Sequence, residues 1–136
     1  MQQISIFLEN AKGRLAQVLE KMAELGVNIR ALSLADTKDF GVLRVIVDEP
    51  ESVAAKLKDN NYVVKITPVW ILRVPDRPGG LAGVLGKLVA EGVNVEYMYA
   101  FVETNGVFAQ VVLRARDQEI MERAVLKHGL SEVAVR

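Results

Sequence analysis

The sequence of 136 residues has no cysteine and a single histidine. The absence of cysteine excludes disulfides, thiol catalysis, cysteine-ligated zinc and iron–sulfur clusters. With His128 alone, a Ser-His-Asp triad or a histidine-rich metal site has too few members to form. We therefore expect a non-catalytic protein with no metal and no cofactor.

Membrane spans and an excess of positive charge are also missing. No apolar run approaches the roughly 20 residues of a membrane-spanning helix, and Gln2 and Gln3 open a short alternating run rather than a signal peptide. Lysine and arginine number 17 against 17 acidic residues, so the formal net charge is zero. Non-specific nucleic-acid binding usually needs a strongly basic face. We expect a cytoplasmic protein that binds neither a membrane nor a nucleic acid.

Apolar residues make up 51% of the chain, which is enough to bury the core of one ordinary domain or of two small ones. The most informative stretch lies between an apolar run at 69–74 and a second apolar run with helical spacing. A strand, a tight Pro-Gly turn and a helix start leave backbone N–H groups and the positive end of a helix dipole open to a ligand. The residues of this stretch are Asp76, Arg77, Pro78, Gly79, Gly80 and Leu81.

A near copy of this stretch occupies the same place in the first half of the chain. It comprises Asn10, Ala11, Lys12, Gly13, Arg14 and Leu15. A shift of 66 residues superposes the two loops and also aligns residues 26–29 with residues 92–95. A turn one residue shorter in the second half then aligns Gly41 with Gly106. These matches indicate duplication of a whole domain, because solenoid repeats are typically about 20–50 residues long.

Each half predicts the order strand, helix, strand, strand, helix, strand. In the first half, alternation predicts a strand at 2–8, and a stripe at helical spacing from Leu15 to Leu25 predicts an amphipathic helix that Gly26 ends. The other expected elements are strands at 27–35, 40–47 and 62–66, a turn at 36–39 and a helix that begins at 48–52. We predict an α+β fold with two ferredoxin-like βαββαβ domains, residues 1–66 and 67–136, each with a four-stranded antiparallel sheet and both helices on one face.

Both faces of the predicted sheets are apolar. In the first half Leu43, Val45 and Val47 alternate with Val42 and Ile46. A face open to water should be polar, so another sheet is expected to cover the outer face. We expect an oligomer, most simply a homodimer.

Two features of the second half concern packing. Tyr97 and Tyr99 are expected to share a face with Val95 in the core. Gly83 and Gly86 lie inside a predicted helix, where each costs about 1 kcal/mol relative to alanine. Close packing of a neighbour and room for a ligand both explain these glycines.

A loop of the form Asp/Asn-x-Pro-Gly-x-Leu between a strand and a helix, followed after the helix by Gly-Val-Asn-Ile/Val, resembles the ACT domain. This domain is a small-molecule-binding module attached to many enzymes of amino-acid metabolism. The resemblance covers nearly the whole chain, twice, so the chain resembles a tandem ACT-domain regulatory protein. The first half departs from the pattern where Lys12 replaces the proline and Arg14 replaces a small residue.

The resemblance implies that a free amino acid is held between two paired domains. One domain supplies its strand-to-helix loop, and its neighbour supplies the start of its second strand. The loop 76–81 would face Asn28 and Ile29 of the first half or of another chain. The loop 10–15 would face Asn94 and Val95. A separate metabolic enzyme is a further candidate partner.

The residue types fit this ligand on chemical grounds. Its carboxylate needs donors, which the N–H groups of residues 79–81 provide at a helix N-terminus. Acceptors for its ammonium group are Asp76 or Asn10. The amide oxygens of Asn28 or Asn94 add further acceptors. Asp76 and Asn10 also fit simple helix capping.

Three other functions stay open on the sequence alone. The chain fits a regulatory subunit of an amino-acid biosynthetic enzyme, of the acetolactate-synthase small-subunit type. RNA-binding modules of the RRM class share the element order, but residues 38–45 hold one aromatic side chain, and the chain lacks a net positive charge. An acylphosphatase-like hydrolase needs an arginine-bearing phosphate loop and an asparagine that positions water, and Arg14 is only a partial match.

Overall fold

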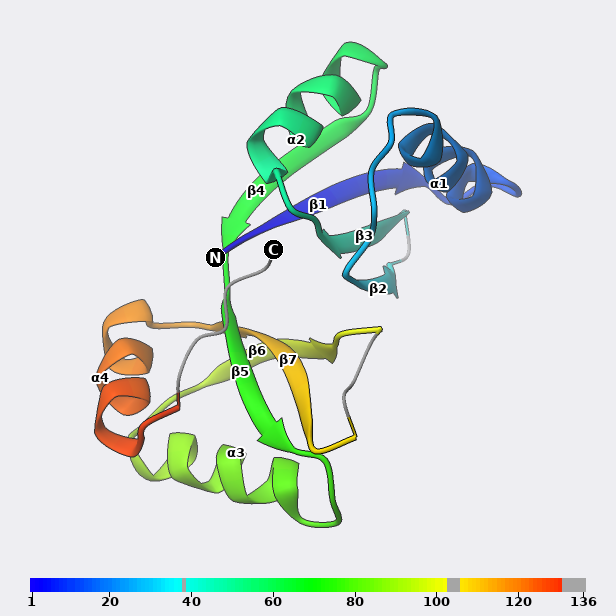
Figure 1. Ribbon diagram of the computed structural model, residues 1–136. Helices are drawn as coiled ribbons and strands as arrows, with labels where there is room; N and C mark the ends of the chain where they lie inside the picture. Colours follow the sequence, from blue (N-terminus) through cyan, green and yellow to red (C-terminus); the bar gives the residue numbers. More distant parts are fainter. Residues whose placement is uncertain (38, 103–105, 131–136) are drawn as a thin grey trace. The chain divides into compact units, whose positions relative to one another are not determined.

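A computed structural model describes residues 1–37, 39–102 and 106–130 (Figure 1). The chain divides into two compact units, the first from Gln2 to Pro68 and the second made of Met1 and the described chain from Val69 to Leu130. Each unit combines an antiparallel sheet with two helices in its described part, which confirms the predicted ferredoxin-like α+β fold. Within the described ranges, no helix has the length and apolar character needed to cross a membrane.

The first unit is a four-stranded sheet in the order β2-β3-β1-β4 with antiparallel neighbours. Its elements are β1 (Gln2–Glu9), α1 (Arg14–Glu24), β2 (Ala31–Asp36), β3 (Phe40–Ile46), α2 (Pro50–Asp59) and β4 (Val63–Pro68). The predicted apolar stripe of α1 buries Val18 and Met22 completely. Burial of an apolar side chain of this size contributes about 1.5–3 kcal/mol. The core consists of Ile4, Ile6, Leu8, Val18, Met22, Leu43, Val45, Val47, Val53, Ala54 and Leu57.

The second strand of the first unit starts four residues later than the sequence predicts, at Ala31. Gly26 has a φ of 74°, and the N–H of Val27 donates to the carbonyl of Met22 at 2.9 Å. Such a bond closes a helix C-terminus through a left-handed glycine. The chain therefore needs several residues to turn back to the sheet, and Asn28 lies in this connection rather than in the strand.

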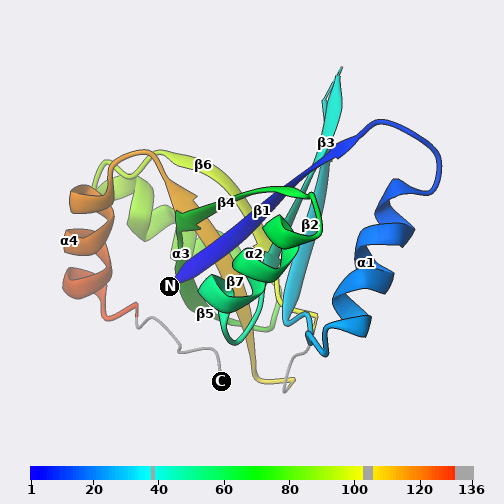
Figure 2. The ribbon, with the colours of Figure 1, turned by 90° about the horizontal axis from the view of Figure 1, so that it is seen from above.

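The second unit has a sheet in the order β5-β7-β6 in its described part. Its elements are β5 (Trp70–Pro75), α3 (Gly80–Ala90), β6 (Val95–Ala100), β7 (Phe108–Ala115) and α4 (Gln118–His128). Its predicted last strand, after α4, lies outside the described residues, as does residue 38 of the predicted turn in the first unit. The helices α3 and α4 lie side by side (Figure 2).

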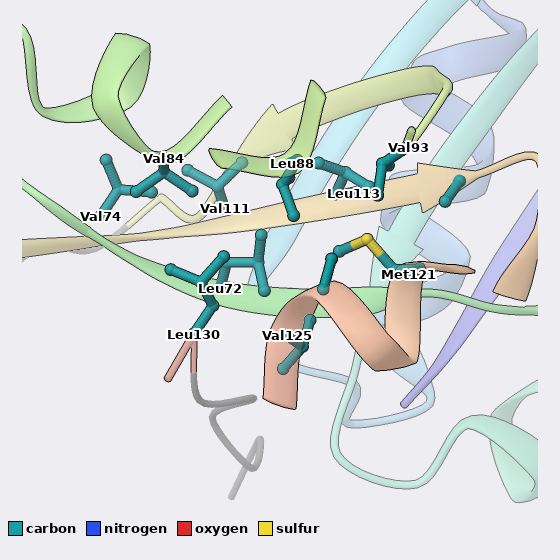
Figure 3. Packing of buried hydrophobic residues seen from close by; sticks show 12 residues of the cluster. Leu72, Val74, Val84, Leu88, Val93, Val111, Leu113, Met121, Val125 and Leu130 are labelled. Carbon is teal, nitrogen blue, oxygen red and sulfur yellow. The ribbon is translucent and has the colours of Figure 1, made fainter. Parts of the chain in front are cut away.

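The core of the second unit lies between these two helices and the sheet. Figure 3 shows Leu88 of α3 and Met121 of α4 pointing toward the strands, where Leu72 and Leu113 meet them. All four side chains are at most 1% exposed. The complete cluster consists of Leu72, Val74, Val84, Leu88, Val93, Val111, Leu113, Ala115, Met121, Ala124, Val125 and Leu130.

The pairing of the strands corrects the alignment of the two halves after their second strands. Gly41 of β3 lies opposite Leu8 of β1, and Ala109 of β7 lies opposite Val74 of β5. Because Leu8 and Val74 correspond, Gly41 corresponds to Ala109, and the match with Gly106 is wrong. The connection between β6 and β7 is two residues longer than that between β2 and β3. Hairpin connections accept such insertions, so a two-residue sequence match does not fix the register.

A β-bulge in β6 also overturns the expected position of the tyrosines. Val95 pairs with Ala115, whereas Tyr97 pairs with the preceding residue of β7, so the strand pairing shifts between Val95 and Tyr97. A bulge places an extra residue on one strand and thereby reverses the faces of the residues beyond it. Val95 and Met98 pack against the core, and Tyr97 and Tyr99 lie on the opposite face.

Candidate functional site

The two glycine loops have the same backbone conformation. Gly13 precedes α1 with φ 85° and ψ −4°, and Gly79 precedes α3 with φ 83° and ψ −8°. This left-handed region suits glycine, because a side chain there meets the following carbonyl. Lys12 in the first loop therefore leads to the same turn as Pro78 in the second.

The same hydrogen bond closes both turns. The N–H of Arg14 donates to the carbonyl of Ala11 at 3.3 Å, and the N–H of Gly80 donates to the carbonyl of Arg77 at 3.0 Å. The N–H of Gly80 is thus engaged inside the turn, contrary to its expected role as a donor to a ligand. The N–H of Leu81 has no hydrogen-bond partner within the described chain.

Helix capping does not explain the polar residues that open the loops. The N-cap positions of α1 and α3 are Gly13 and Gly79, and neither helix has a side-chain cap within the described residues. Asn10 and Asp76 lie three residues earlier. Both residues are exposed. The backbone N–H of Asp76 donates to the carbonyl of Val107 at 2.9 Å.

A cavity of about 280 Å³ lies beside the first loop, and we name it the first-loop cavity. Leu8, Glu9, Asn10, Ala11, Arg14, Leu15, Leu34, Ala35, Asp36 and Gly41 line it. It brings together four predicted site residues with the end of β2 and the start of β3, which the sequence did not associate with the loop. The pairing of Asp36 with Gly41, itself opposite Leu8, places this strand end beside the loop.

The first-loop cavity presents charges of both signs. The Nη1 of Arg14 donates to the Oε1 of Gln17 at 3.1 Å. Its Nε is buried and has no hydrogen-bond partner in the part of the chain that the structure describes. Glu9 and Asp36 supply carboxylates, and three leucine side chains supply an apolar wall.

A second cavity, of about 350 Å³, lies beside the second loop, and we name it the second-loop cavity. Its lining consists of Arg73, Pro75, Arg77, Gly79, Gly80, Gly83, Val84, Lys87, Phe108, His128, Gly129 and Leu130. Among the described residues no acidic side chain lines it. The guanidinium carbon of Arg73 lies 4.4 Å from the centre of the Phe108 ring.

Two glycines of α3 line this cavity for different reasons. A Cβ atom on Gly80 would lie 2.0 Å from the carbonyl oxygen of Pro75, so only glycine fits there. A Cβ atom on Gly83 would meet no atom within 4 Å. Close packing therefore accounts for Gly80 and not for Gly83. Gly86 is equally free of contacts and lies outside the lining, and nothing in the structure explains it.

An ion-pair cluster lies at the C-terminal ends of α3 and α4. Glu91 Oε1 lies 2.9 Å from Lys127 Nζ and 3.0 Å from His128 Nε2. The hydrogen bonds from Lys127 and His128 hold the pKa of Glu91 below its ordinary value. His128 reaches the second-loop cavity from this cluster. It ends α4, and Gly129 follows with a φ of 64°.

The two predicted asparagines lie away from the loop of their own unit. Asn28 lines a cavity of about 360 Å³ beside the start of α2, and Asn94 lines one of about 680 Å³ beside the start of α4. Neither cavity shares a residue with the cavity at the loop of the same unit. The other predicted site residues line none of these four cavities, and they are Lys12, Gly13, Ile29, Asp76, Pro78, Leu81 and Val95.

Comparison with known families agrees with these paired loops and paired folds. The whole chain, residues 1–136, matches the family model of the ACT domain pair. The chain belongs to this family. The resemblance inferred from the sequence is thereby confirmed.

Several solved structures share this fold. The chain is 42% identical to protein BT0572 from Bacteroides thetaiotaomicron, over 98% of this chain and 91% of that one, with a TM-score of 0.89. It is 18% identical to the regulatory subunit of aspartate kinase from Thermus thermophilus, over 93% of this chain and 91% of that one, with a TM-score of 0.63. The corresponding subunit from Thermus flavus is also 18% identical, over 93% and 90% of the two chains, with a TM-score of 0.59. No curated protein matches the chain.

Proposed function

We propose that this ACT protein is a non-catalytic regulator that binds a free amino acid with an aliphatic side chain in the first-loop cavity. One observation carries this proposal. Arg14 keeps a buried Nε without a partner among the described residues, in a cavity that also holds carboxylates and an apolar wall. A zwitterion with an apolar side chain needs these three kinds of contact together.

The carboxylate of the ligand is assigned to Arg14. A buried donor without a partner costs about 1–3 kcal/mol, which a carboxylate relieves by accepting from Nε. The hydrogen bond from Nη1 to Gln17 holds the guanidinium group in place before the ligand arrives. The N-terminus of α1, immediately adjacent, adds a partial positive charge that favours an anion.

The ammonium group is assigned to the carboxylates of Glu9 and Asp36, with the amide oxygen of Asn10 as a further acceptor. The ligand side chain then contacts the leucines of β1, α1 and β2 that form the apolar wall. Branched aliphatic amino acids satisfy this wall better than polar ones, because burial of apolar area contributes about 25 cal/mol per Å².

A second ACT unit is proposed to complete the site. Asn28 and Asn94 share no cavity with the loop of their own unit, so contact with a ligand held by a loop needs a different unit. In this arrangement Asn94 faces the first loop, and Asn28 faces the loop 76–81. A homodimer supplies such pairs and covers the apolar outer faces that the sequence indicates.

We propose that ligand binding changes either the self-assembly of the protein or its affinity for an enzyme partner. Two similar structures are regulatory subunits of aspartate kinase. We therefore propose an enzyme of amino-acid metabolism as the partner. Linkage requires that this partner bind the occupied and the empty protein with different affinities.

Calorimetric titration of the full chain with each of the twenty amino acids tests the proposal. An aliphatic amino acid is expected to bind, and at 100 times its Kd to stabilise the fold by about 2.7 kcal/mol. Arg14→Lys keeps the charge but removes Nε–H, so the affinity is expected to fall about tenfold. Lys58→Gln, an exposed position on α2 outside the cavity, is the control and should bind like the wild type.

Two results would overturn the proposal. The first is that no amino acid binds at millimolar concentration. The second is that Arg14→Lys binds the amino acid as tightly as the wild type does. Sedimentation with and without the amino acid checks the dimer, which is expected to become tighter or looser on binding.

A further inference from the structure

We propose that the second-loop cavity binds a small phosphate-bearing metabolite at a site separate from the amino-acid site. Three cationic side chains converge on this cavity from three consecutive parts of the second unit. They are Arg73 from β5, Arg77 from the loop and Lys87 from α3. The cavity has no acidic lining residue in the described part of the chain.

The charge of this cavity is not compensated within the described residues. The ion pairs among the described residues use Lys21, Arg30, Arg114, Lys127 and His128. Of these only His128 lines the cavity, and none of the pairs involves Arg73, Arg77 or Lys87. The whole chain has zero formal net charge, so this gathering is local. A cleft lined by charges of one sign raises the local concentration of ligands of the opposite sign.

Arg73 is positioned by an aromatic ring rather than by an acid. It lies over Phe108, which orients the guanidinium group without neutralising its charge. The corresponding residues of the first unit, Phe7 and Phe40, form an aromatic pair with ring centres 5.7 Å apart. Arg73 in the second unit thus takes the place of the Phe7 ring in the first. A planar guanidinium group binds phosphate with two parallel hydrogen bonds.

The start of α3 provides the positive end of a helix dipole and room. Gly79 and Gly80 bring the helix N-terminus to the cavity wall, where its dipole favours an anion. Gly83 adds space that no packing contact requires. At the positions of Gly80 and Gly83 the first unit has Arg14 and Gln17, whose side chains bond to each other at 3.1 Å.

The occupant is identified by what the cavity offers and what it omits. The ammonium group of an amino acid would find no carboxylate among the described lining residues, so the zwitterion of the first-loop cavity does not suit this one. A phosphate group takes cations and N–H donors only. The volume of about 350 Å³ leaves room beside Phe108 and Leu130 for an organic part.

Calorimetric titration of the full chain with inorganic pyrophosphate, inorganic phosphate and citrate, at constant ionic strength, tests this site. Pyrophosphate is expected to bind at one site per chain, and more weakly as salt is raised. Arg73→Gln and Lys87→Gln are each expected to weaken it about tenfold. Arg123→Gln removes the same charge from an exposed position on α4 outside the lining, and should bind like the wild type.

A second pair of variants tests the space rather than the charge. Gly83→Ala places a methyl group in the cavity wall, and Gly86→Ala places one on the same helix outside it. Both should stabilise α3 by a similar amount, because alanine favours a helix over glycine. Only Gly83→Ala is expected to weaken pyrophosphate, by several-fold.

The following results would overturn the inference. They are the absence of heat and of ³¹P line changes with millimolar pyrophosphate, tighter binding of citrate than of pyrophosphate, and an equal loss of affinity in Arg123→Gln. Arg14→Lys separates this site from the proposed amino-acid site, because it should leave pyrophosphate binding unchanged. A protein that binds pyrophosphate and no amino acid would keep this inference and refute the proposed function.

Discussion

Residues 10–15 and 76–81 form the same turn, with Gly13 and Gly79 at nearly equal backbone angles, yet the cavities beside them differ in charge. The first-loop cavity has an arginine and two carboxylates, and the second-loop cavity has only cations among its described charged residues. The backbone is thus common to both sites, and side chains at a few matched positions set the charge.

The matched positions show how this difference arises. Glu9 and Asp36, the two carboxylates of the first-loop cavity, correspond to Pro75 and Val102 in the second unit. Ala11 corresponds to Arg77, so the second-loop cavity gains a cation, and Asp76, which corresponds to Asn10, lies outside its lining. The cavities of a duplicated fold can therefore differ in charge without any change in its turns.

The largest expected effect concerns the position where the loops differ in packing. Gly80→Ala forces a Cβ against the carbonyl oxygen of Pro75, and should lower the free energy of unfolding of the second unit by about 1–3 kcal/mol. Trp70, the single tryptophan, belongs to the second unit, so its fluorescence during urea unfolding reports this change. Gly83→Ala is the control and should stabilise by up to about 1 kcal/mol. Wild-type stability in Gly80→Ala would contradict the stated contact.

A smaller effect tests whether the two turns are equivalent. Gly13→Ala and Gly79→Ala each place a side chain in the left-handed region, and each should cost about 1–2 kcal/mol. Urea unfolding followed by circular dichroism, with Trp70 fluorescence for the second unit, measures both. Equal costs would support a common backbone. If the two costs differ by more than about 1 kcal/mol, the two turns are not equivalent.

The smallest effect depends on an ionisable group that the first unit lacks. Glu91 corresponds to Leu25, and its pKa is lowered by Lys127 and His128. A lowered carboxyl pKa stabilises the fold above the unfolded value of 4.5 and loses this contribution as the pH falls through the folded value. Glu91→Gln should therefore be slightly less stable than the wild type at pH 7, and the difference should shrink as the pH falls below 4.5. Thermal unfolding at pH 7 and at pH 3 measures this, and an equal difference at both would refute it.

The sequence predicted the features that depend on local chemistry. The left-handed glycines, the amphipathic stripe of α1 and the proline at the start of α2 are each specified within a few residues, and the structure has them. The repeat at a shift of 66 residues then extended the fold to the second half. The match of Gly41 with Gly106 was wrong because a match of only two residues cannot reveal an insertion in the hairpin connection.

The sequence could not predict which residues line the two cavities, and the reason is physical. Asp36 reaches the first loop only through strand pairing, some twenty residues along the chain from Arg14. Arg73 had no reason to stand out, because an arginine in an alternating strand usually points to solvent. The bulge at Val95 similarly moved Tyr97 to the other face without a glycine or proline to signal it.

The contact between Gly80 and the Pro75 carbonyl also limits how the two halves can evolve. Arg14 lines the first-loop cavity, but an arginine cannot take the corresponding place in the second unit, since even a methyl group has no room there. No single substitution can then convert the second site into a copy of the first. Such a conversion would also require the end of β5 at Pro75 to move.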